Sequence, residues 1–201
     1  MRIIAGDLKG RKLIAPEGEG TRPTTDRVRE SVMSVIHSAR GGFDGAVVLD
    51  AFAGSGALAI ESLSRGARSA VLYERAPEAA RAVAANLEKV GLDARRARLV
   101  RADVMERPPA FARPPFDLVF LDPPYAYAAA EVLGMVAGLA DAGQLAAGAI
   151  VVYEHSLSSA KEAIAAADEA GLSVAQSKKY GDTVVDVLIA GQGDQARSED
   201  E

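Results

Sequence analysis

The chain has 201 residues, 49% of them hydrophobic, which is enough to bury one core. Its 28 acidic and 23 basic side chains give a net charge of −5, so it is not a generally basic nucleic-acid binder. It has no cysteine, which excludes disulfides and thiolate metal sites, and its two histidines, His37 and His155, are too few for a histidine-rich metal centre. No apolar run is long enough to cross a bilayer and the first residues lack the apolar segment of a secretory signal, so we expect a cytoplasmic protein without membrane contact.

Residues 1–40 differ from the rest and are predicted to form an appendage. The sequence "MRIIAGDLKGRKLIAP" indicates a β-hairpin around a glycine-containing turn, and residues 24–39 have the spacing of an amphipathic helix. A pair of glycines marks the join to a core domain, which we expect to span residues 41–190. The remaining residues, 191–201, are acidic with little apolar content, so we expect a disordered tail.

From residue 46 onward, continuous apolar strands alternate with helical patterns. Strands are expected at 46–50, 69–74, 97–103, 116–122, 148–155, 172–181 and 183–191. Helices are expected at 57–65, 77–91, 129–143 and 159–171. This alternation predicts an α/β fold in which a mostly parallel sheet carries helices on both faces. The last two strands have no helix between them, so they should pair antiparallel.

A glycine-containing loop follows the first of these strands in "VVLDAFAGSGALA". Gly54, Gly56 and Ala59 match the G-x-G-x-x-G/A spacing of a nucleotide-binding turn, and Glu74 ends the next strand 18 residues after Gly56. The alternative is a tight turn that needs glycine only for its geometry. The strand before the loop and the helix after it favour a ligand-binding role.

Acidic residues decide which ligand this loop would hold. Asp50 ends the first core strand, and its negative charge would oppose a pyrophosphate, which disfavours a nicotinamide dinucleotide. The same charge suits the sulfonium and ammonium groups of S-adenosylmethionine, so we expect that cofactor. Glu74 would accept the ribose hydroxyls, and Asp103, at the end of the third strand, would lie at the adenine. Each acid alone could be a helix cap or a solvated loop residue.

The segment "FDLVFLDPPYAYA" ends the fourth core strand in a carboxylate, two prolines and a tyrosine. Proline has no backbone N–H, so Asp122, Pro123 and Pro124 present hydrogen-bond acceptors with few donors. Such a loop suits a substrate with an exocyclic amine, and Tyr125 adds a flat face on which a base can stack. A rigid turn is the alternative, but its position at the same sheet edge as the glycine loop favours catalysis.

Positive charge gathers at the start of the chain. In the first 15 residues, Arg2, Lys9, Arg11 and Lys12 stand against Asp7 alone. This segment could contact the phosphates of a nucleic acid. The alternative is a solvated hairpin surface.

Several of these segments resemble known methyltransferases. The sequences "LDAFAGSGALAIE", "FDLVFLDPPY" and "VYEHS" look like those of S-adenosylmethionine-dependent amino-methyltransferases with a [DN]PP[YF] motif. The sequences "MRIIAGDLKGRKL", "TRPTTDRVRESV" and "KKYGDTVVDV" resemble the RsmD-type bacterial 16S rRNA guanine-N2 methyltransferases, and the similarity runs from Met1 to about Ile189. The resemblance implies a Rossmann-like class I methyltransferase fold, whose seven-stranded, mostly parallel sheet has one antiparallel strand.

The resemblance also implies roles for individual residues. The cofactor would be held by Asp50, Ala51, Phe52, Gly54, Gly56, Glu74, Asp103 and Thr25. The target base would be held by Asp122, Pro123, Pro124 and Tyr125. The positive charge of the N-terminal region, rather than the resemblance, predicts RNA contacts at Arg2, Lys9, Arg11, Lys12 and Arg22. The substrate would be one guanine of 16S rRNA, methylated at N2 in the small subunit or an assembly intermediate, by a monomeric enzyme that needs no metal.

Alternative functions remain at this point. A DNA adenine-N6 or protein glutamine methyltransferase would use the same motif. The glutamine enzymes are expected to read NPPY, however, and 201 residues leave little room for a DNA target-recognition domain. A ribosome assembly factor that binds S-adenosylmethionine without catalysis is disfavoured by the intact DPPY.

Overall fold

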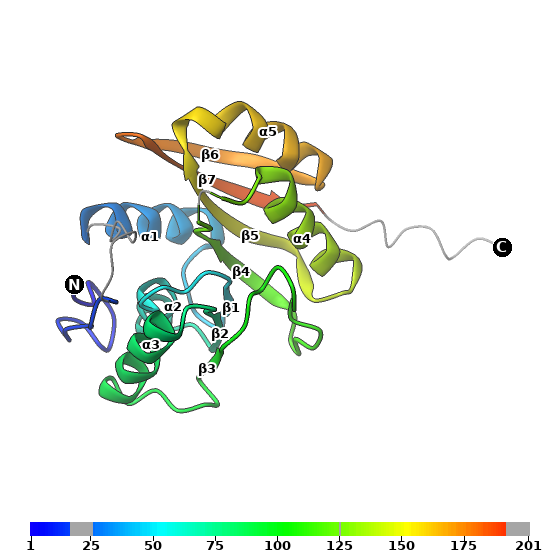
Figure 1. The fold of residues 1–201 in the computed structure, drawn as a ribbon. Helices are drawn as coiled ribbons and strands as arrows, with labels where there is room; N and C mark the ends of the chain where they lie inside the picture. Colours follow the sequence, from blue (N-terminus) through cyan, green and yellow to red (C-terminus); the bar gives the residue numbers. More distant parts are fainter. Residues whose placement is uncertain (17–25, 125, 192–201) are drawn as a thin grey trace.

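The structure, a computed structural model, describes residues 1–16, 26–124 and 126–191 (Figure 1). Within these residues a seven-stranded sheet has helices packed on both of its faces. Arg22, Thr25 and Tyr125, which the sequence analysis assigned to the site, lie outside the described residues. So does the predicted tail, apart from Gly191.

The sheet confirms the predicted mixed topology. Its strand order is β3-β2-β1-β4-β5-β7-β6, and the pairs from β3 to β5 are parallel. β7 runs antiparallel to both of its neighbours, and a tight turn connects it directly to β6. The strands are β1 (Val47–Asp50), β2 (Ser69–Tyr73), β3 (Ala97–Val100), β4 (Phe116–Leu121), β5 (Leu145–Ser156), β6 (Leu172–Tyr180) and β7 (Thr183–Ala190).

Helices form a layer on each face of the sheet. The helices are α1 (Asp26–Arg40), α2 (Ala57–Ser64), α3 (Pro77–Lys89), α4 (Ala129–Asp141) and α5 (Ala160–Glu169), and a single 3₁₀ turn, η1 (Leu157–Ser159), precedes α5. Residues of α1, α2 and α3 share one buried cluster with the sheet, and residues of α4 and α5 share the other.

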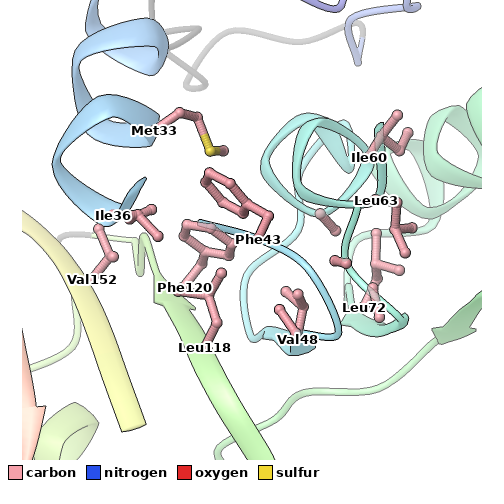
Figure 2. Packing of buried hydrophobic residues seen from close by; sticks show 14 of the residues in the cluster. Met33, Ile36, Phe43, Val48, Ile60, Leu63, Leu72, Leu118, Phe120 and Val152 are labelled. Atoms are coloured by element: carbon pink, nitrogen blue, oxygen red, sulfur yellow. The ribbon is translucent and has the colours of Figure 1, made fainter. Parts of the chain in front are cut away.

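Alternating side chains of the central strands supply both clusters. Leu118 and Phe120 of β4 belong to the first cluster, where Figure 2 shows Phe120 beside Ile36 of α1. Val119, the residue between them, is fully buried in the second cluster. Successive side chains of a strand point to opposite faces, and a central strand covered on both faces therefore reads as one continuous apolar run. This arrangement leaves the ends of the strands as the places where polar side chains can gather.

The N-terminal segment forms the predicted hairpin in a short form. Arg2 and Lys12 make an antiparallel bridge. Three backbone bonds also join the two arms: Ile3 N–H donates to the Arg11 carbonyl at 3.0 Å, Gly10 N–H to the Ile3 carbonyl at 2.9 Å, and Leu13 N–H to the Met1 carbonyl at 3.1 Å. Its backbone also bonds to the core, since the Glu61 carboxylate of α2 accepts from the N–H groups of Ile4 and Ala5, at 2.8 and 3.0 Å. The Glu61 carboxylate thus holds the hairpin against α2.

The same segment is also anchored through the apolar core and the glycine loop. Ile3 and Leu13 are buried in the first cluster. The Asn86 side chain of α3 exchanges hydrogen bonds with both backbone groups of Ile14 and donates to the carbonyl of Ser55 at 2.9 Å. The predicted division of the chain at residue 40 stays a prediction, but the first 14 residues pack as part of the core.

Candidate active site

Four acidic residues follow the carboxyl ends of four parallel strands. Asp50 ends β1, Glu74 follows β2, Asp103 lies shortly after β3 and Asp122 follows β4. The parallel pairing of β1 with β2 and with β4 brings these strand ends to one edge of the sheet. In open α/β sheets this edge is where ligands bind. The structure therefore groups the acids as the sequence predicted.

The glycine loop is held to the neighbouring strands by backbone and side-chain bonds. The N–H of Ala51 donates to the carbonyl of Phe120 at 3.0 Å, and the N–H of Ala53 donates to that of Tyr73 at 2.9 Å. The N–H of Gly54 donates to one carboxylate oxygen of Glu74 at 2.8 Å, while Ala76 N–H occupies the other. Glu74 thus fixes the loop, which is a role that the sequence analysis did not assign to it.

The two glycines of the loop are needed for different reasons. Both have left-handed backbone angles, with φ of +56° at Gly54 and +77° at Gly56. A Cβ atom added at Gly56 would lie 3.1 Å from a methyl group of Leu72 and 3.4 Å from one of Val83, so this glycine permits close packing of α2 onto the core. A Cβ atom at Gly54 would meet nothing within 4 Å. Open space for a ligand therefore borders Gly54 rather than Gly56.

Asp50 is a buried carboxyl group without a compensating cation among the described residues. It is 2% exposed, and the hydrogen bond that it accepts from the N–H of Ala59 is a long one, at 3.3 Å. Burial raises the pKa of Asp50 to about 7; the Ala59 N–H opposes this rise, and the negative charges of Asp122 and Glu74 add to it. A cationic ligand at this position would lower that pKa and stabilise the carboxylate.

Asp122 lies at the mouth of the same site. Water reaches the residue, yet the protein atoms packed around its carboxyl group raise its pKa to about 6 by desolvation. The direction of the shift agrees with the repulsion between Asp122 and Asp50. Pro123 and Pro124 follow it without backbone N–H groups, so the loop presents acceptors, as predicted.

A second polar cluster occupies the ends of β2 and β3. Tyr127 donates to the Oδ2 atom of Asp103 at 2.7 Å, and Arg75 donates to the same oxygen at 2.8 Å. Burial raises the pKa of Asp103, but hydrogen bonds from Tyr127, the Met105 N–H and Arg75 outweigh burial and hold this pKa below its ordinary value. Asp103 is therefore a preformed carboxylate, and its predicted contact with adenine stays a prediction.

Sequence reasoning missed Arg75 and Tyr127. The ring of Tyr127 lies 6.0 Å from the ring of Phe52, and the Arg75 guanidinium lies 5.4 Å from the Tyr127 centroid. These contacts connect the glycine loop with the segment after DPPY. The available signal was the second tyrosine of "PPYAYA", two residues after the motif.

A buried ion pair lies farther along the same sheet edge. The Nε2 atom of His155, near the end of β5, lies 2.9 Å from Oδ2 of Asp186 on β7, and its Nδ1 atom lies 2.9 Å from the carbonyl of Ser156. Both ring nitrogens face acceptors, an arrangement that favours the protonated ring. Burial lowers the pKa of His155, but Asp186 and the Ser156 carbonyl outweigh burial and raise it above the ordinary value.

The predicted RNA-contacting residues lie on the surface of the N-terminal segment. Arg2, Lys9, Arg11 and Lys12 are all exposed. A cavity of about 280 Å³ between this segment and α1 is lined by both cations and acids, among them Arg2, Lys9, Asp26 and Glu30. This cavity is separate from the strand-end site, and the RNA-contacting role stays a prediction.

Two findings bear on metals and membranes. The described residues contain no cluster of three or more histidine, cysteine or acidic side chains arranged to hold a metal ion. In the same part of the chain, no helix has the length and apolar character needed to span a bilayer.

The strand order, the antiparallel β7 and the glycine loop after β1 define a Rossmann-like class I methyltransferase fold. A solved Escherichia coli protein, yhhF, superposes with a TM-score of 0.79 at 30% identity, covering 96% of this chain and 98% of that one. A magnesium protoporphyrin IX methyltransferase from Synechocystis, solved with bound SAM, shares the fold alone (TM-score 0.65, 17% identity, 82% and 79% coverage).

Sequence comparison narrows this class to one family. The chain matches the family described as Conserved hypothetical protein 95 over residues 1–189. It is 38% identical over 138 residues to Ribosomal RNA small subunit methyltransferase D of Haemophilus influenzae, covering 65% of this chain and 67% of that protein. The segments matched in several curated relatives span 60 to 67% of their length. The chain belongs to this family, the RsmD-type rRNA methyltransferases, as its sequence motifs indicated. These methyltransferase relatives support the predicted cofactor, S-adenosylmethionine.

Proposed function

We propose that the protein transfers a methyl group from S-adenosylmethionine to N2 of one guanine in 16S rRNA, within the small ribosomal subunit or an assembly intermediate. The observation that carries the proposal is the pair formed by Asp50 and Asp122, two carboxyl groups with raised pKa values at adjacent strand ends. Two such groups suit a cationic cofactor and an amine that becomes positive as it reacts. The names of the relatives as small-subunit rRNA methyltransferases support the choice of RNA.

The residues at the site fit the cofactor. Asp50 supplies a buried negative charge without a cation, and the space beside Gly54 is open. Glu74 and Asp103 would accept from the ribose and the adenine, and Phe52 with Tyr127 offers an aromatic surface for a flat ring. When bound, S-adenosylmethionine supplies a methyl group on an already activated sulfonium.

The DPPY loop would hold the amine of the target base. Asp122 and the carbonyl of Pro123 would each accept a hydrogen bond from the N2 amino group, and Tyr125 would stack on the ring. These bonds strengthen as positive charge develops on the nitrogen, which favours the transition state over the ground state. Asp122 need not act as a strong base, since the proton can leave after methylation. A guanine in a loop would enter at the lowest unstacking cost.

The variant Asp122→Ala tests this proposal. We expect it to bind S-adenosylmethionine normally in calorimetry but to lose about 100-fold or more of single-turnover methyl transfer to small-subunit particles. Asp141→Ala, at the exposed end of α4, is the control. Nucleoside mass spectrometry of the product identifies the methylated atom.

The outcomes separate the proposal from its alternatives. N2-methylguanosine from the wild-type protein and its loss in Asp122→Ala support it. Retained turnover in the variant would overturn the role of Asp122. N6-methyladenosine, methylated glutamine, or cofactor binding without any transfer would each favour one of the alternative functions.

A further inference from the structure

Arginine is concentrated in residues 95–113, a stretch in which only Asp103 was given a function from the sequence. Six arginines fall within residues 95–113, against the two acids Asp103 and Glu106, in a chain whose net charge is −5. All six residues are exposed, although the Arg96 guanidinium also donates to the carbonyls of Leu63 and Ala67, at 3.5 and 3.0 Å. The six arginines are Arg95, Arg96, Arg98, Arg101, Arg107 and Arg113. The segment contains no lysine, and arginine is the cation that both pairs with phosphate and stacks on bases.

Arg98 of β3 and Arg107 of the connection are brought together by how the chain passes from β3 to β4. β3 is the edge strand of the sheet, and the connection over residues 101–115 then returns along the face covered by α4 (Figure 1). Buried Val104 and Ala112 fix this connection to the second core cluster. The arginines of the strand and those of the connection are therefore both attached to the packed core.

Electrostatics at Tyr73 show that the two parts converge. Burial raises the pKa of the Tyr73 hydroxyl, and the positive charges of Arg98 and Arg107 both oppose that rise. Arg98 lies on β3 and Arg107 on the connection, so charges nine residues apart act on one group. Asp103 does little to neutralise the surface, because its carboxylate is already bonded to Arg75 and Tyr127.

One side chain of the basic N-terminal segment reaches the end of α3, a few residues before the arginine-rich stretch. Arg11 donates to the carbonyl of Val90 at 3.1 Å, which brings its guanidinium to the end of α3 next to Lys89. The chain runs from there directly into Arg95 and Arg96. The predicted RNA contact at Arg11 therefore lies near the start of this stretch.

One aromatic side chain stands among these cations. Phe111 is 89% exposed and lies between Arg107 and Arg113 in "RPPAFARPP". Isolated apolar side chains are common on surfaces, but exposed aromatics interleaved with cations are typical of single-stranded nucleic-acid binding. The flanking prolines have fixed φ angles, which limits the conformational freedom lost on binding.

We propose that β3 and the 101–115 connection form a second RNA-binding surface, where arginines contact phosphates and Phe111 stacks on an unpaired base. The proposal rests on the proposed function, since it supposes an RNA substrate. The positive charge of this surface favours RNA as the partner. A protein partner is disfavoured because Phe111 is the one large apolar side chain exposed in this part of the described chain.

The test uses two variants with different signatures in binding to protein-free 16S rRNA. Arg107→Gln with Arg113→Gln should weaken binding about tenfold at low salt, and the slope of log K against log salt should fall by about 0.7 for each phosphate that is no longer neutralised. Phe111→Ala should weaken binding by roughly tenfold with an unchanged salt slope, because stacking releases no counterions.

A matched control separates a local surface from a general effect of charge. Arg81→Gln with Lys161→Gln removes two exposed cations from α3 and α5 and makes the same change in net charge. All variants should bind S-adenosylmethionine like the wild type. Unchanged affinity and salt slope in the Arg107/Arg113 variant, or an equal loss in the control, would overturn the proposal.

Two further outcomes keep this proposal distinct from the proposed function. Normal binding to protein-free rRNA combined with weaker binding to small-subunit particles would assign the surface to a ribosomal protein and overturn the RNA contact. If the wild-type protein methylates no rRNA, the proposed function fails. The binding measurements then still decide whether this surface contacts RNA.

Discussion

Two pairs of ionisable groups at the same edge of the sheet are in opposite electrostatic states. At the ends of β1 and β4, Asp50 and Asp122 have raised pKa values and pair with no cation among the described residues. At the β5–β7 junction, His155 and Asp186 are buried together at 2.9 Å and balance each other. The balanced pair can serve the fold alone. The unbalanced pair lowers the stability of the fold unless a cationic ligand binds beside it, and it therefore indicates the functional site.

The largest effect is expected when the balanced pair is broken. His155→Gln leaves Asp186 as an uncompensated buried charge, so the free energy of unfolding should fall by about 3–5 kcal/mol near pH 6. The folded-state pKa of His155 is raised and that of Asp186 is lowered. The pair's contribution is therefore fully present between the unfolded pKa values of 3.8 and 6.5, and it is lost as pH rises through the folded pKa of His155.

Denaturant unfolding at several pH values measures this effect. His37→Gln, at the exposed histidine of α1, is the control and should change stability by less than about 0.5 kcal/mol. A His155 variant as stable as the wild type at pH 6 would show that the pair of His155 and Asp186 does not stabilise the fold.

The opposite sign is expected when the unbalanced pair is neutralised. The pKa of Asp50 is about 7 in the folded chain and 3.8 without burial, so the folded state binds the proton more tightly and the wild type loses stability as pH rises from 4 to 7. Asp50→Asn should therefore raise the free energy of unfolding at pH 8 by about 2 kcal/mol and should make no difference near pH 4. It should also weaken S-adenosylmethionine binding by about tenfold or more.

The same shift predicts a pH dependence of cofactor binding. A cation beside Asp50 favours the ionised carboxylate, so the affinity of the wild type for S-adenosylmethionine should fall as pH drops below about 7. This fall should be absent in Asp50→Asn. Parallel pH profiles of the two proteins would exclude Asp50 from the cofactor site.

The two glycines of the loop allow the same comparison, because Gly56 is needed for packing and Gly54 borders open space for a ligand. Gly56→Ala forces a Cβ atom against Leu72 at a positive φ, so we expect a stability loss of about 2 kcal/mol. Gly54→Ala meets open space and should lose about 1 kcal/mol from backbone strain alone. Its affinity for S-adenosylmethionine should nevertheless fall further than that of Gly56→Ala. Calorimetry on the folded variants decides, and the reverse order would move the cofactor away from Gly54.

The elements and the strand-end acids could be predicted because both depend on local patterns. The run ending in Asp50 and the run ending in Asp122 each read as a buried strand, and parallel topology then brings their ends together. The ion pair could not be predicted, because His155 meets Asp186 only through the antiparallel register of β5 with β7. The steric need for Gly56 likewise depends on where Leu72 packs.

Contacts between loops that are far apart in the sequence could not be predicted either. Tyr127 reaches Asp103 across 24 residues, and no periodicity connects the two. The hairpin was predicted from its turn, but the hydrogen bonds that Glu61 on α2 accepts from its backbone could not be. Side chains that capture backbone groups from another segment have no signature in local patterns.

The smallest effect is expected at Tyr127, which extends the comparison to the third acid of the site. Asp103 is balanced by Arg75 yet remains part of the predicted adenine contact, so it combines both electrostatic states. Tyr127→Phe removes one hydrogen bond from its carboxylate but keeps the ring beside Phe52. We expect S-adenosylmethionine to bind about fivefold more weakly, which corresponds to about 1 kcal/mol, because the carboxylate is less firmly oriented.

Tyr180→Phe is the control and should bind normally, because the Tyr180 hydroxyl donates to Ser31 on α1. A gain in affinity in Tyr127→Phe would mean that the hydroxyl competes with adenine for Asp103, and the tyrosine would then be an obstacle that the cofactor displaces.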